Sequence, residues 1–265
     1  MKTVGFIGCG NMGSAIMGGI LKKGYTDAAH VIAADKSAAQ LKKAEEAFGI
    51  RTTQENLEAV KESDIIFLSV KPQFYETVIQ EIRDCVDEKK LVITIAPGWS
   101  LERLAASFGR KVQIVRTMPN TPALVGEGNI VVTPGTFVSE ENLEEALFIL
   151  RCCGKATLIP ENLMDAAVAV SGSSPAYVFM MIEAMADAAV IDGMPRAQAY
   201  QFAAQAVYGS AKMVLETGKH PGELKDMVCS PAGTTIEAVR VLEEKGFRSS
   251  IIEAMQSCTR KTKGM

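Results

Sequence analysis

The feature that most constrains the fold of this chain is a glycine pattern near its start. Gly8, Gly10 and Gly13 have G-x-G-x-x-G spacing within MKTVGFIGCGNMG. The apolar run Val4–Ile7 predicts a strand before them, and apolar residues at helical spacing predict a helix after them. In such a unit the glycines permit a tight turn, the approach of a diphosphate and close packing of helix on strand. This context predicts a dinucleotide site at the helix N-terminus; the alternative is a glycine-rich structural turn.

The composition is that of an ordinary globular protein. The 265 residues are 48% hydrophobic and 22% charged, which suits one large or two modest domains. A net charge of -3 gives no electrostatic reason to expect nucleic acid or an anionic membrane as a partner. The six cysteines form no C-x-x-C pair and there are only two histidines, so we expect neither a metal site nor a disulfide framework. We expect a cytoplasmic protein, since no secretory leader pattern is present either.

Strand-like and helix-like segments alternate up to about residue 160. Apolar runs predict strands at Val4–Ile7, Val31–Ala34, Ile65–Val70, Leu91–Ile95, Val112–Val115, Ile130–Val132 and Ala156–Ile159. Helical patterns lie between several of them, at Ala38–Phe48, Gln73–Ile82, Leu101–Phe108 and Glu140–Leu150. This alternation predicts an α/β domain with a mostly parallel, doubly wound sheet, in which ligands bind at the carboxyl ends of the strands.

The end of the second predicted strand bears on the choice of cofactor. Asp35 lies 22 residues beyond Gly13, where a carboxylate accepts hydrogen bonds from the adenosine ribose hydroxyls, and this favours NAD. Lys36 follows at once and would instead meet the 2′-phosphate of NADP. Both side chains also fit an ordinary solvated loop. The choice between NAD(H) and NADP(H) stays open at this point.

Three further strand ends contribute loops to the same edge of the sheet. Ser69–Pro72 follows the strongest apolar strand, and Pro72 suits the first position of a helix, so this loop is expected beside the cofactor. Its Lys71 is otherwise a plain surface lysine. The loop 95–98 is expected to line the nicotinamide ribose. The loop Arg116–Pro122 contains two prolines and either borders the active site or only interrupts a helix.

Beyond Pro160 the strand signals stop and helix signals repeat, so we place a domain boundary there and an all-helical domain over 161–265. The segment Pro175–Val190 is apolar nearly all round. Glu183 and Asp187 interrupt it. A bilayer crossing needs about 20 residues, and this segment is shorter. A helix that is hydrophobic on every side must be buried in protein. We therefore predict that it is buried across a subunit interface, because a domain of this size has little interior.

The stretch SPAGTT at residues 230–235 is the chemically suggestive part of this second domain. Its first two residues suit a helix cap and a first helical position that needs no N–H. The backbone N–H groups of Ala232, Gly233 and Thr234 are then expected to be free beside two hydroxyl groups. Such a helix end suits a carboxylate, while the alternative is an ordinary capped helix.

Taken together, five pieces of the sequence resemble pyrroline-5-carboxylate reductases: GFIGCGNMG, SVKPQ, RTMPNTP, SGSSPAYV and HPGELKDMVCSPAGTTIEAV. The resemblance extends from Gly5 to about Arg260 and is most specific in His220–Val239. It implies an N-terminal Rossmann domain and an all-α domain that interlocks with a partner's domain in a homodimer, which often assembles into a ring of dimers. It also implies reduction of the ring C=N bond of 1-pyrroline-5-carboxylate to L-proline by NADPH or NADH, the last step of proline biosynthesis.

The motifs and the resemblance together define the candidate site. The expected cofactor contacts are Ile7, Gly8, Cys9, Gly10, Asn11, Met12, Gly13, Asp35, Lys36, Asn56, Ser69, Val70, Lys71, Pro72 and Ala96. The expected substrate contacts are Ser230, Ala232, Gly233, Thr234 and Thr235. The family commonly has glycine where Ala232 stands, and it often lacks an acid at the position of Asp35. A protonated imine is already a good electrophile, so the protein mainly positions two ligands and excludes water. Thr235 is our candidate for orienting or protonating the ring nitrogen.

Two other functions fit parts of the sequence. A related imine or 3-hydroxyacid reductase would share the architecture. Hydroxyacid dehydrogenases with a similar glycine motif, however, usually carry a catalytic Lys in the first long helix of the second domain, and Pro175–Val190 has none. A non-catalytic redox sensor would bind the dinucleotide and report through a helical dimer. The SPAGTT helix end argues against a sensor, which needs no second anion site.

Overall fold

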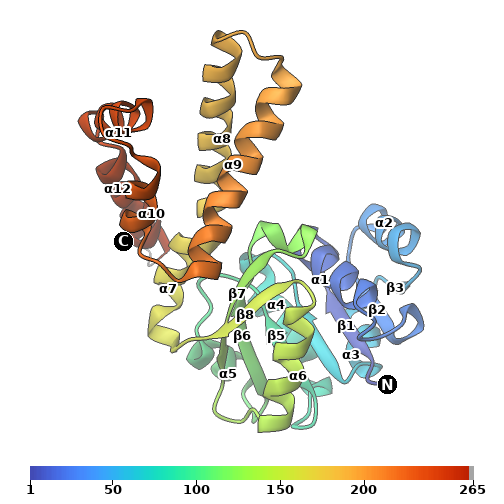
Figure 1. The fold of residues 1–265 in the computed structure, drawn as a ribbon. Helices are drawn as coiled ribbons and strands as arrows, with labels where there is room; N and C mark the ends of the chain where they lie inside the picture. Colours follow the sequence, from blue (N-terminus) through green and yellow to red (C-terminus); the bar gives the residue numbers. More distant parts are fainter. Residues whose placement is uncertain (263–265) are drawn as a thin grey trace. The chain divides into compact units, whose positions relative to one another are not determined.

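A computed structural model describes residues 1–262, and the chain divides into two compact units (Figure 1). The first unit contains Met1–Ser173 together with the end of the chain from Thr259, and the second contains Ser174–Cys258. The boundary expected near residue 160 stays a prediction; the division between these units falls further along, within the helical region.

The first unit is built on one sheet with the strand order β3-β2-β1-β4-β5-β6-β7-β8. All neighbouring strands are parallel except β6 and β7. The strands are β1 Val4–Ile7, β2 Val31–Ala34, β3 Arg51–Thr53, β4 Ile65–Leu68, β5 Leu91–Thr94, β6 Gln113–Met118, β7 Gly128–Pro134 and β8 Gly154–Leu158. The mostly parallel, doubly wound sheet is confirmed. Its strand order reverses between β1 and β4, and ligands of such sheets bind at this switch point.

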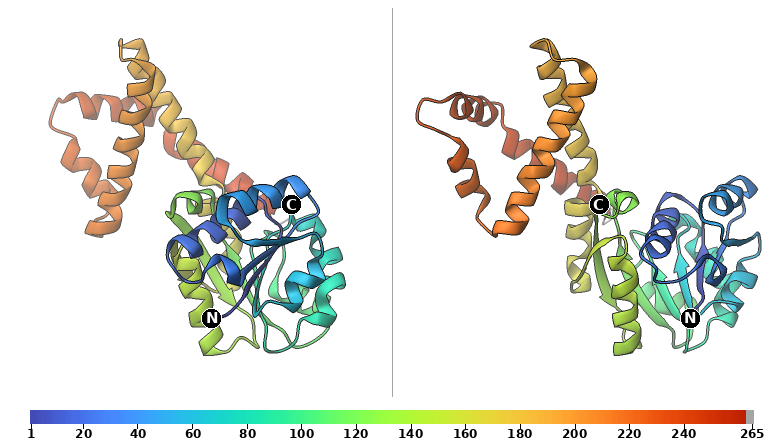
Figure 2. Two further views of the ribbon diagram at one scale, coloured as in Figure 1. Left: turned by 90° about the vertical axis from the view of Figure 1, so that its right-hand side faces the viewer. Right: turned by 45° about the vertical axis from the view of Figure 1, so that its right-hand side comes forward.

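Helices cover both faces of this sheet (Figure 2). They are α1 Asn11–Lys22, α2 Ala38–Phe48, α3 Asn56–Lys61, α4 Tyr75–Ile82, α5 Leu101–Phe108 and α6 Glu140–Arg151, followed by the short α7 Met164–Ala167. Helices α1, α2 and α6 enclose a core in which Phe6 stacks on Phe67 with ring centroids 4.8 Å apart. Helices α3, α4 and α5 enclose the other core, around Tyr75 and Trp99. Burial on both faces explains why the central strands are continuous apolar runs.

Neither β3 and α3 nor the direction of β7 was predicted from the sequence. β3 consists of Arg51, Thr52 and Thr53, so this edge strand has no apolar run, and α3 is only six residues long. β6 and β7 are joined by the short 3₁₀ segment Thr121–Val125. Because no crossover helix lies between these two strands, they run antiparallel.

Among the described residues, the second unit contains only helices, which confirms the all-α domain. They are α8 Ser174–Ile191, α9 Arg196–Thr217, α10 Pro221–Val228, α11 Thr234–Glu244 and α12 Phe247–Thr262. α8 and α9 form an antiparallel pair (Figure 1). α9 ends at Thr217, and Gly218 follows as a left-handed C-cap with a φ of 64°. The helix expected to open at Ser230 begins only at Thr234, and α12 was not predicted.

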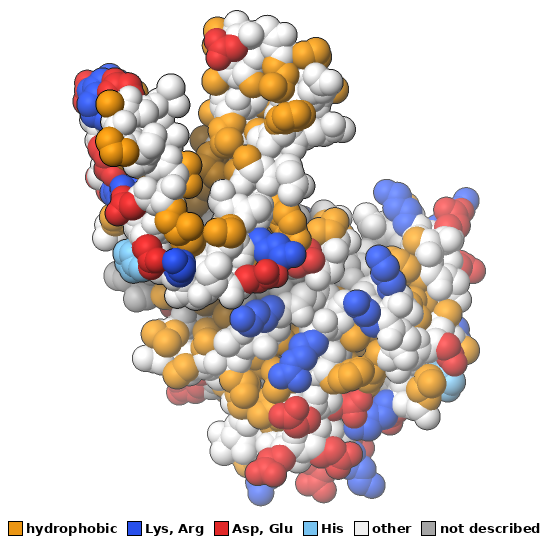
Figure 3. Space-filling model, viewed as in Figure 1, with side chains coloured by type: hydrophobic (Ala, Val, Ile, Leu, Met, Phe, Trp, Pro, Cys, Tyr) orange, Lys and Arg blue, Asp and Glu red, His pale blue; other side chains and the backbone are white. Residues whose placement is uncertain are grey.

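Large apolar side chains of the second unit lie on its surface. Only alanines, Ala186, Ala199 and Ala203, are buried within it. Phe179 and Met180 on α8 are 60% and 68% exposed, and Figure 3 shows hydrophobic side chains gathered over the α8–α9 pair. Among the described residues, the helical stretch Glu161–Ile191 is long and apolar enough to cross a membrane by length and composition alone. An exposed apolar surface of this extent marks an interaction site.

Candidate functional site

The glycine turn between β1 and α1 has the geometry of an anion site. Gly8 has a φ of +107°, and a Cβ there would lie 2.8 Å from the carbonyl of Ser69. A Cβ on Gly13 would lie 2.6 Å from the carbonyl oxygen of Gly8. At Gly10, the N-cap of α1, a Cβ would meet nothing within 4 Å, and no side chain caps the helix. Packing therefore requires the first and third glycines, whereas the second leaves space for a ligand at a helix N-terminus.

A cavity of about 350 Å³ opens beside this turn, at the carboxyl ends of β1, β2 and β4. Eight of the expected cofactor residues line it: Gly8, Gly10, Asp35, Lys36, Asn56, Ser69, Val70 and Lys71. The fold thus brings the glycine turn, the end of the second strand and the loop after β4 to one cavity at the point where the strand order reverses.

The other expected cofactor residues lie outside this lining: Ile7, Cys9, Asn11, Met12, Gly13, Pro72 and Ala96. The side chains of Ile7 and Ala96 are buried in the core, so only their backbone is left to meet a ligand. Asn11 is exposed in the first turn of α1. The N–H of Cys9 donates to Asp35 Oδ2 at 2.8 Å. Burial and the nearby charge of Asp35 raise the pKa of the Cys9 thiol to about 12, so it is a neutral thiol at pH 7.

One wall of the cavity was not predicted from the sequence. Phe74, Thr77 and Val78 line it: Phe74 ends the 3₁₀ turn that Pro72 opens, and the other two lie in α4. Their i, i+3, i+4 spacing places all three on one face of a helical segment. That spacing, read onward from Pro72, is the signal that identifies them. Phe74 is 53% exposed and presents a flat apolar surface at the cavity rim.

The N-terminus of α11 is the second candidate anion site, and it lies in the helical unit. The expected cap by Ser230 is wrong: Gly233 is the N-cap, and no side chain caps the helix. The carbonyl of Ser230 instead accepts the N–H of Gly233 at 3.0 Å. This N–H was expected to be free, and that prediction is wrong. A Cβ on Gly233 would lie 2.3 Å from Ser230 Oγ. Only glycine allows the serine hydroxyl to lie this close to the start of the helix.

Ala232 takes a backbone conformation that favours glycine. Its φ is +57°, and no other non-glycine residue among those described has a positive φ. Thr234 is exposed and Thr235 is partly buried, both in the first turn of α11. The first-turn N–H groups of a helix have no intrahelical acceptor, so this end offers backbone donors beside two hydroxyls. The arrangement suits a carboxylate.

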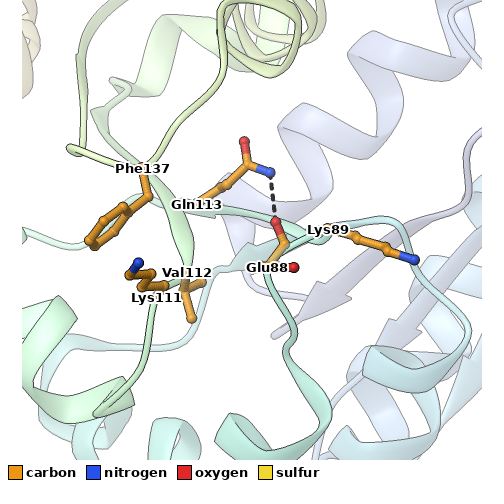
Figure 4. A pocket seen from close by; sticks show the side chains of 6 residues that line it. All are labelled: Glu88, Lys89, Lys111, Val112, Gln113 and Phe137. Carbon is orange, nitrogen blue, oxygen red and sulfur yellow. Dashed lines mark hydrogen bonds between the residues drawn. The ribbon is translucent and has the colours of Figure 1, made fainter.

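A shallow hollow lies where β5 and β6 begin (Figure 4). This is the edge of the sheet opposite the cavity lined by Gly8 and Gly10. In the hollow the side chain of Gln113 donates to the carbonyl of Glu88 at 2.8 Å, and the Lys111 ammonium lies 5.7 Å from the centre of the Phe137 ring. None of the expected site residues lies here, and parallel sheets bind ligands at their other edge. Residues 1–262 contain no cluster of three or more side chains suited to a metal ion.

Two parts of the chain match models of known protein families. Residues 3–98 match a family model described as NADP oxidoreductase coenzyme F420-dependent, and residues 161–265 match one described as pyrroline-5-carboxylate reductase dimerisation. The pyrroline-5-carboxylate reductase of Escherichia coli K12 is 54% identical over 261 residues, which cover 98% of this chain and 97% of the relative.

Two solved structures have the same fold over nearly the full length. A pyrroline-5-carboxylate reductase from Coxiella burnetii superposes with a TM-score of 0.90 at 33% identity, covering 99% of this chain and 98% of the other. The pyrroline carboxylate reductase of Plasmodium falciparum, solved with NADP bound, superposes with a TM-score of 0.91 at 31% identity. The match covers 99% of this chain and 97% of the other.

Proposed function

This chain belongs to the pyrroline-5-carboxylate reductase family, and on that premise we propose that it reduces the ring C=N bond of 1-pyrroline-5-carboxylate to L-proline. The observation that carries this proposal is 54% identity over 98% of the chain, a range that includes the glycine turn and the SPAGTT segment. The reaction is an oxidoreduction that uses a pyridine nucleotide, and it completes proline biosynthesis.

A reduced nicotinamide dinucleotide fits the cavity of the first unit. The space at Gly10 and the start of α1 suit its diphosphate, and Asp35 suits its adenosine ribose. The loop Ser69–Pro72 and the side chain of Phe74 would border the rest of the molecule. The bound dihydronicotinamide supplies a hydride to the ring carbon of the C=N bond.

The N-terminus of α11 would hold the substrate. Its first-turn N–H groups and the positive end of the helix dipole favour the carboxylate, and the Thr234 hydroxyl adds a donor. In this arrangement the hydroxyl oxygen of Thr235 accepts a hydrogen bond from the protonated ring N–H, orients the imine and holds its proton. Because the protonated imine is already electrophilic, these residues act by positioning the ring and by excluding water.

We also propose that the functional form is a homodimer joined through the helical unit. The uncovered apolar side chains of α8 and α9 support a partner that buries them, and the match to a dimerisation domain supports a second copy of this chain. The predicted burial of Pro175–Val190 across an interface belongs to this proposal. The same proposal includes assembly of the dimers into a ring, a cytoplasmic location and the lack of nucleic-acid or membrane partners.

Purified protein, racemic 1-pyrroline-5-carboxylate and a reduced nicotinamide cofactor test the reaction. We expect loss of the reduced-nicotinamide absorbance with formation of an equal amount of proline, measured with NADH and NADPH in parallel. Dinucleotide binding without oxidation of either cofactor would contradict the proposal and favour the redox sensor.

The role of Thr235 is tested by two variants of similar size. Thr235→Val keeps the shape but loses the hydroxyl, and we expect its kcat to fall by about 10²-fold. Thr235→Ser keeps the hydroxyl and should retain most of the turnover. Full turnover and unchanged substrate affinity in Thr235→Val would rule out this role.

A further inference from the structure

We propose that Asp35 makes this enzyme select NADH over NADPH. The inference rests on the proposed function, because it concerns the dinucleotide used in that reaction. Asp35 directly follows β2 and lines the same cavity as Gly8 and Gly10. In doubly wound sheets the adenosine ribose lies at the end of this strand, so its 2′ position meets the Asp35 side chain.

Two hydrogen bonds fix the Asp35 carboxylate in place. Oδ2 accepts the N–H of Cys9 at 2.8 Å, and Oδ1 accepts the N–H of Ser37 at 2.9 Å. The backbone N–H of Asp35 is itself bonded to the carbonyl of Thr53 on the neighbouring strand, at 3.3 Å. Turning the side chain away from the cavity would leave the Cys9 N–H, in a buried residue, without this acceptor. The carboxylate is therefore a rigid part of the site.

A fixed carboxylate treats the two cofactors differently. Each of its oxygens accepts one backbone N–H and keeps capacity for a second donor, which a ribose 2′-hydroxyl supplies. A 2′-phosphate has no such donor when ionised and brings between one and two further negative charges. Because Asp35 is only partly exposed and held by its two N–H donors, the repulsion is not relieved by rotation of the side chain.

Lys36 is the positive group that opposes this effect. It lines the same cavity, but its side chain is exposed, so its attraction for a phosphate is weakened by water and salt. The Ser37 Oγ accepts the N–H of Gln40 as the cap of α2, at 3.4 Å; its O–H carries no charge and can donate to a hydroxyl as well as to a phosphate. The balance at the end of β2 thus favours the hydroxyl of NADH.

The test is calorimetric measurement of the dissociation constants of NADH and NADPH for the full-length protein, together with kcat/KM for each in the reductase assay. We expect the wild-type protein to bind NADH about tenfold more tightly than NADPH, or better. Asp35→Ser should bring the two dissociation constants together or reverse their order, mainly by tightening NADPH. Asp35→Asn removes the charge but keeps the side-chain size, and it should shift the ratio of the two dissociation constants in the same direction. It serves as the test variant if Asp35→Ser folds poorly.

Asp84→Asn is the matched control. It removes the same charge from an exposed aspartate that pairs with Arg110 at 2.9 Å and does not line the cavity, so the ratio should not change. Equal or tighter binding of NADPH by the wild-type protein would overturn the inference. If Lys36→Ala then abolished that preference, Lys36 would be the residue that sets the choice.

The inference and the proposed function fail in different ways. Turnover of 1-pyrroline-5-carboxylate with NADPH preferred contradicts the role of Asp35 and leaves the reductase function intact. Selective binding of NADH without turnover supports the role of Asp35 and contradicts the reductase function.

Discussion

The phenol of Tyr75 donates a hydrogen bond to the backbone carbonyl of Leu68 at 2.5 Å, and it accepts the N–H of Ile95 at 3.2 Å. Leu68 ends β4 and Ile95 directly follows β5, so the buried phenol joins the two strands where their pairing stops. The indole of Trp99 adds a second link by donating to the carbonyl of Pro72 at 3.1 Å. Together these bonds hold the loop after β4, which lines the dinucleotide cavity.

Tyr75→Phe should weaken dinucleotide binding about tenfold, because it leaves buried groups of Leu68 and Ile95 unpaired and lets the loop after β4 shift. The dissociation constant and Tm are measured together. Tyr25→Phe is the matched control: it removes a phenol that bonds Glu145 at 2.5 Å and does not line the cavity. The control should lower Tm and leave the dissociation constant unchanged. If Tyr75→Phe lowered Tm but left the dissociation constant unchanged, the role of the Tyr75 phenol would be purely structural.

Ala232→Gly should stabilise the protein. The left-handed φ of Ala232 costs an alanine about 1 kcal/mol relative to glycine, so Tm should rise by a few degrees at fixed protein concentration. Ala238→Gly, in the middle of α11, is the opposite case and should lower Tm, since glycine there loses about 0.5–1 kcal/mol. If both substitutions lowered Tm, the strain assigned to Ala232 would be absent.

Glu145 should make stability depend on pH in the acid range. Burial alone would raise the pKa of Glu145, but hydrogen bonds from Lys2 and Tyr25 outweigh it and hold the pKa below its ordinary value. A carboxyl with a lowered pKa in the folded state stabilises the fold above its unfolded pKa, near 4.5, and loses this contribution as the pH falls.

Urea unfolding of Glu145→Gln checks this dependence. The variant should lose about 1 kcal/mol of unfolding free energy at pH 7, with the difference from the wild-type protein shrinking below pH 4. Glu144→Gln, on the exposed side of α6, should match the wild type at both pH values. A pH-independent difference for Glu145→Gln would contradict the assignment.

Phe179→Asp should break the proposed dimer. Phe179 is 60% exposed on α8, and a carboxylate there would be buried without a partner in an interface formed by this helix. Light scattering after size exclusion should show monomer or aggregate in place of the wild-type dimer or higher assembly. Phe137→Asp replaces an aromatic residue of similar exposure, 49%, in the sheet unit and should keep the wild-type mass. An unchanged mass for Phe179→Asp would place the interface elsewhere.

The positions of the buried strands along the chain and the glycine turn are predictable because their signals are local. A run such as Ile65–Leu68 is apolar since both faces of the strand are covered, and Gly8, Gly10 and Gly13 have roles set by neighbours a few residues away. β3 escapes prediction because an edge strand of three polar residues has neither an apolar run nor alternation.

The details that decide binding are less visible because they depend on tertiary contacts. The bond from Cys9 to Asp35 joins residues 26 positions apart, and no local pattern shows that it fixes the carboxylate. The start of α11 was placed too early because Ser230 looks like a cap, whereas its carbonyl bonds to Gly233. The positive φ of Ala232 was unforeseen because alanine gives no signal for it.

The most direct measurement is transfer of deuterium from the reduced cofactor to the product. With a dihydronicotinamide deuterated at its hydride position on the transferred face, and 1-pyrroline-5-carboxylate as substrate, we predict proline with one deuterium on the ring carbon of the former C=N bond. Mass spectrometry and NMR of the product report this directly. Cofactor oxidation without label in proline, or no proline at all, would contradict the reductase account.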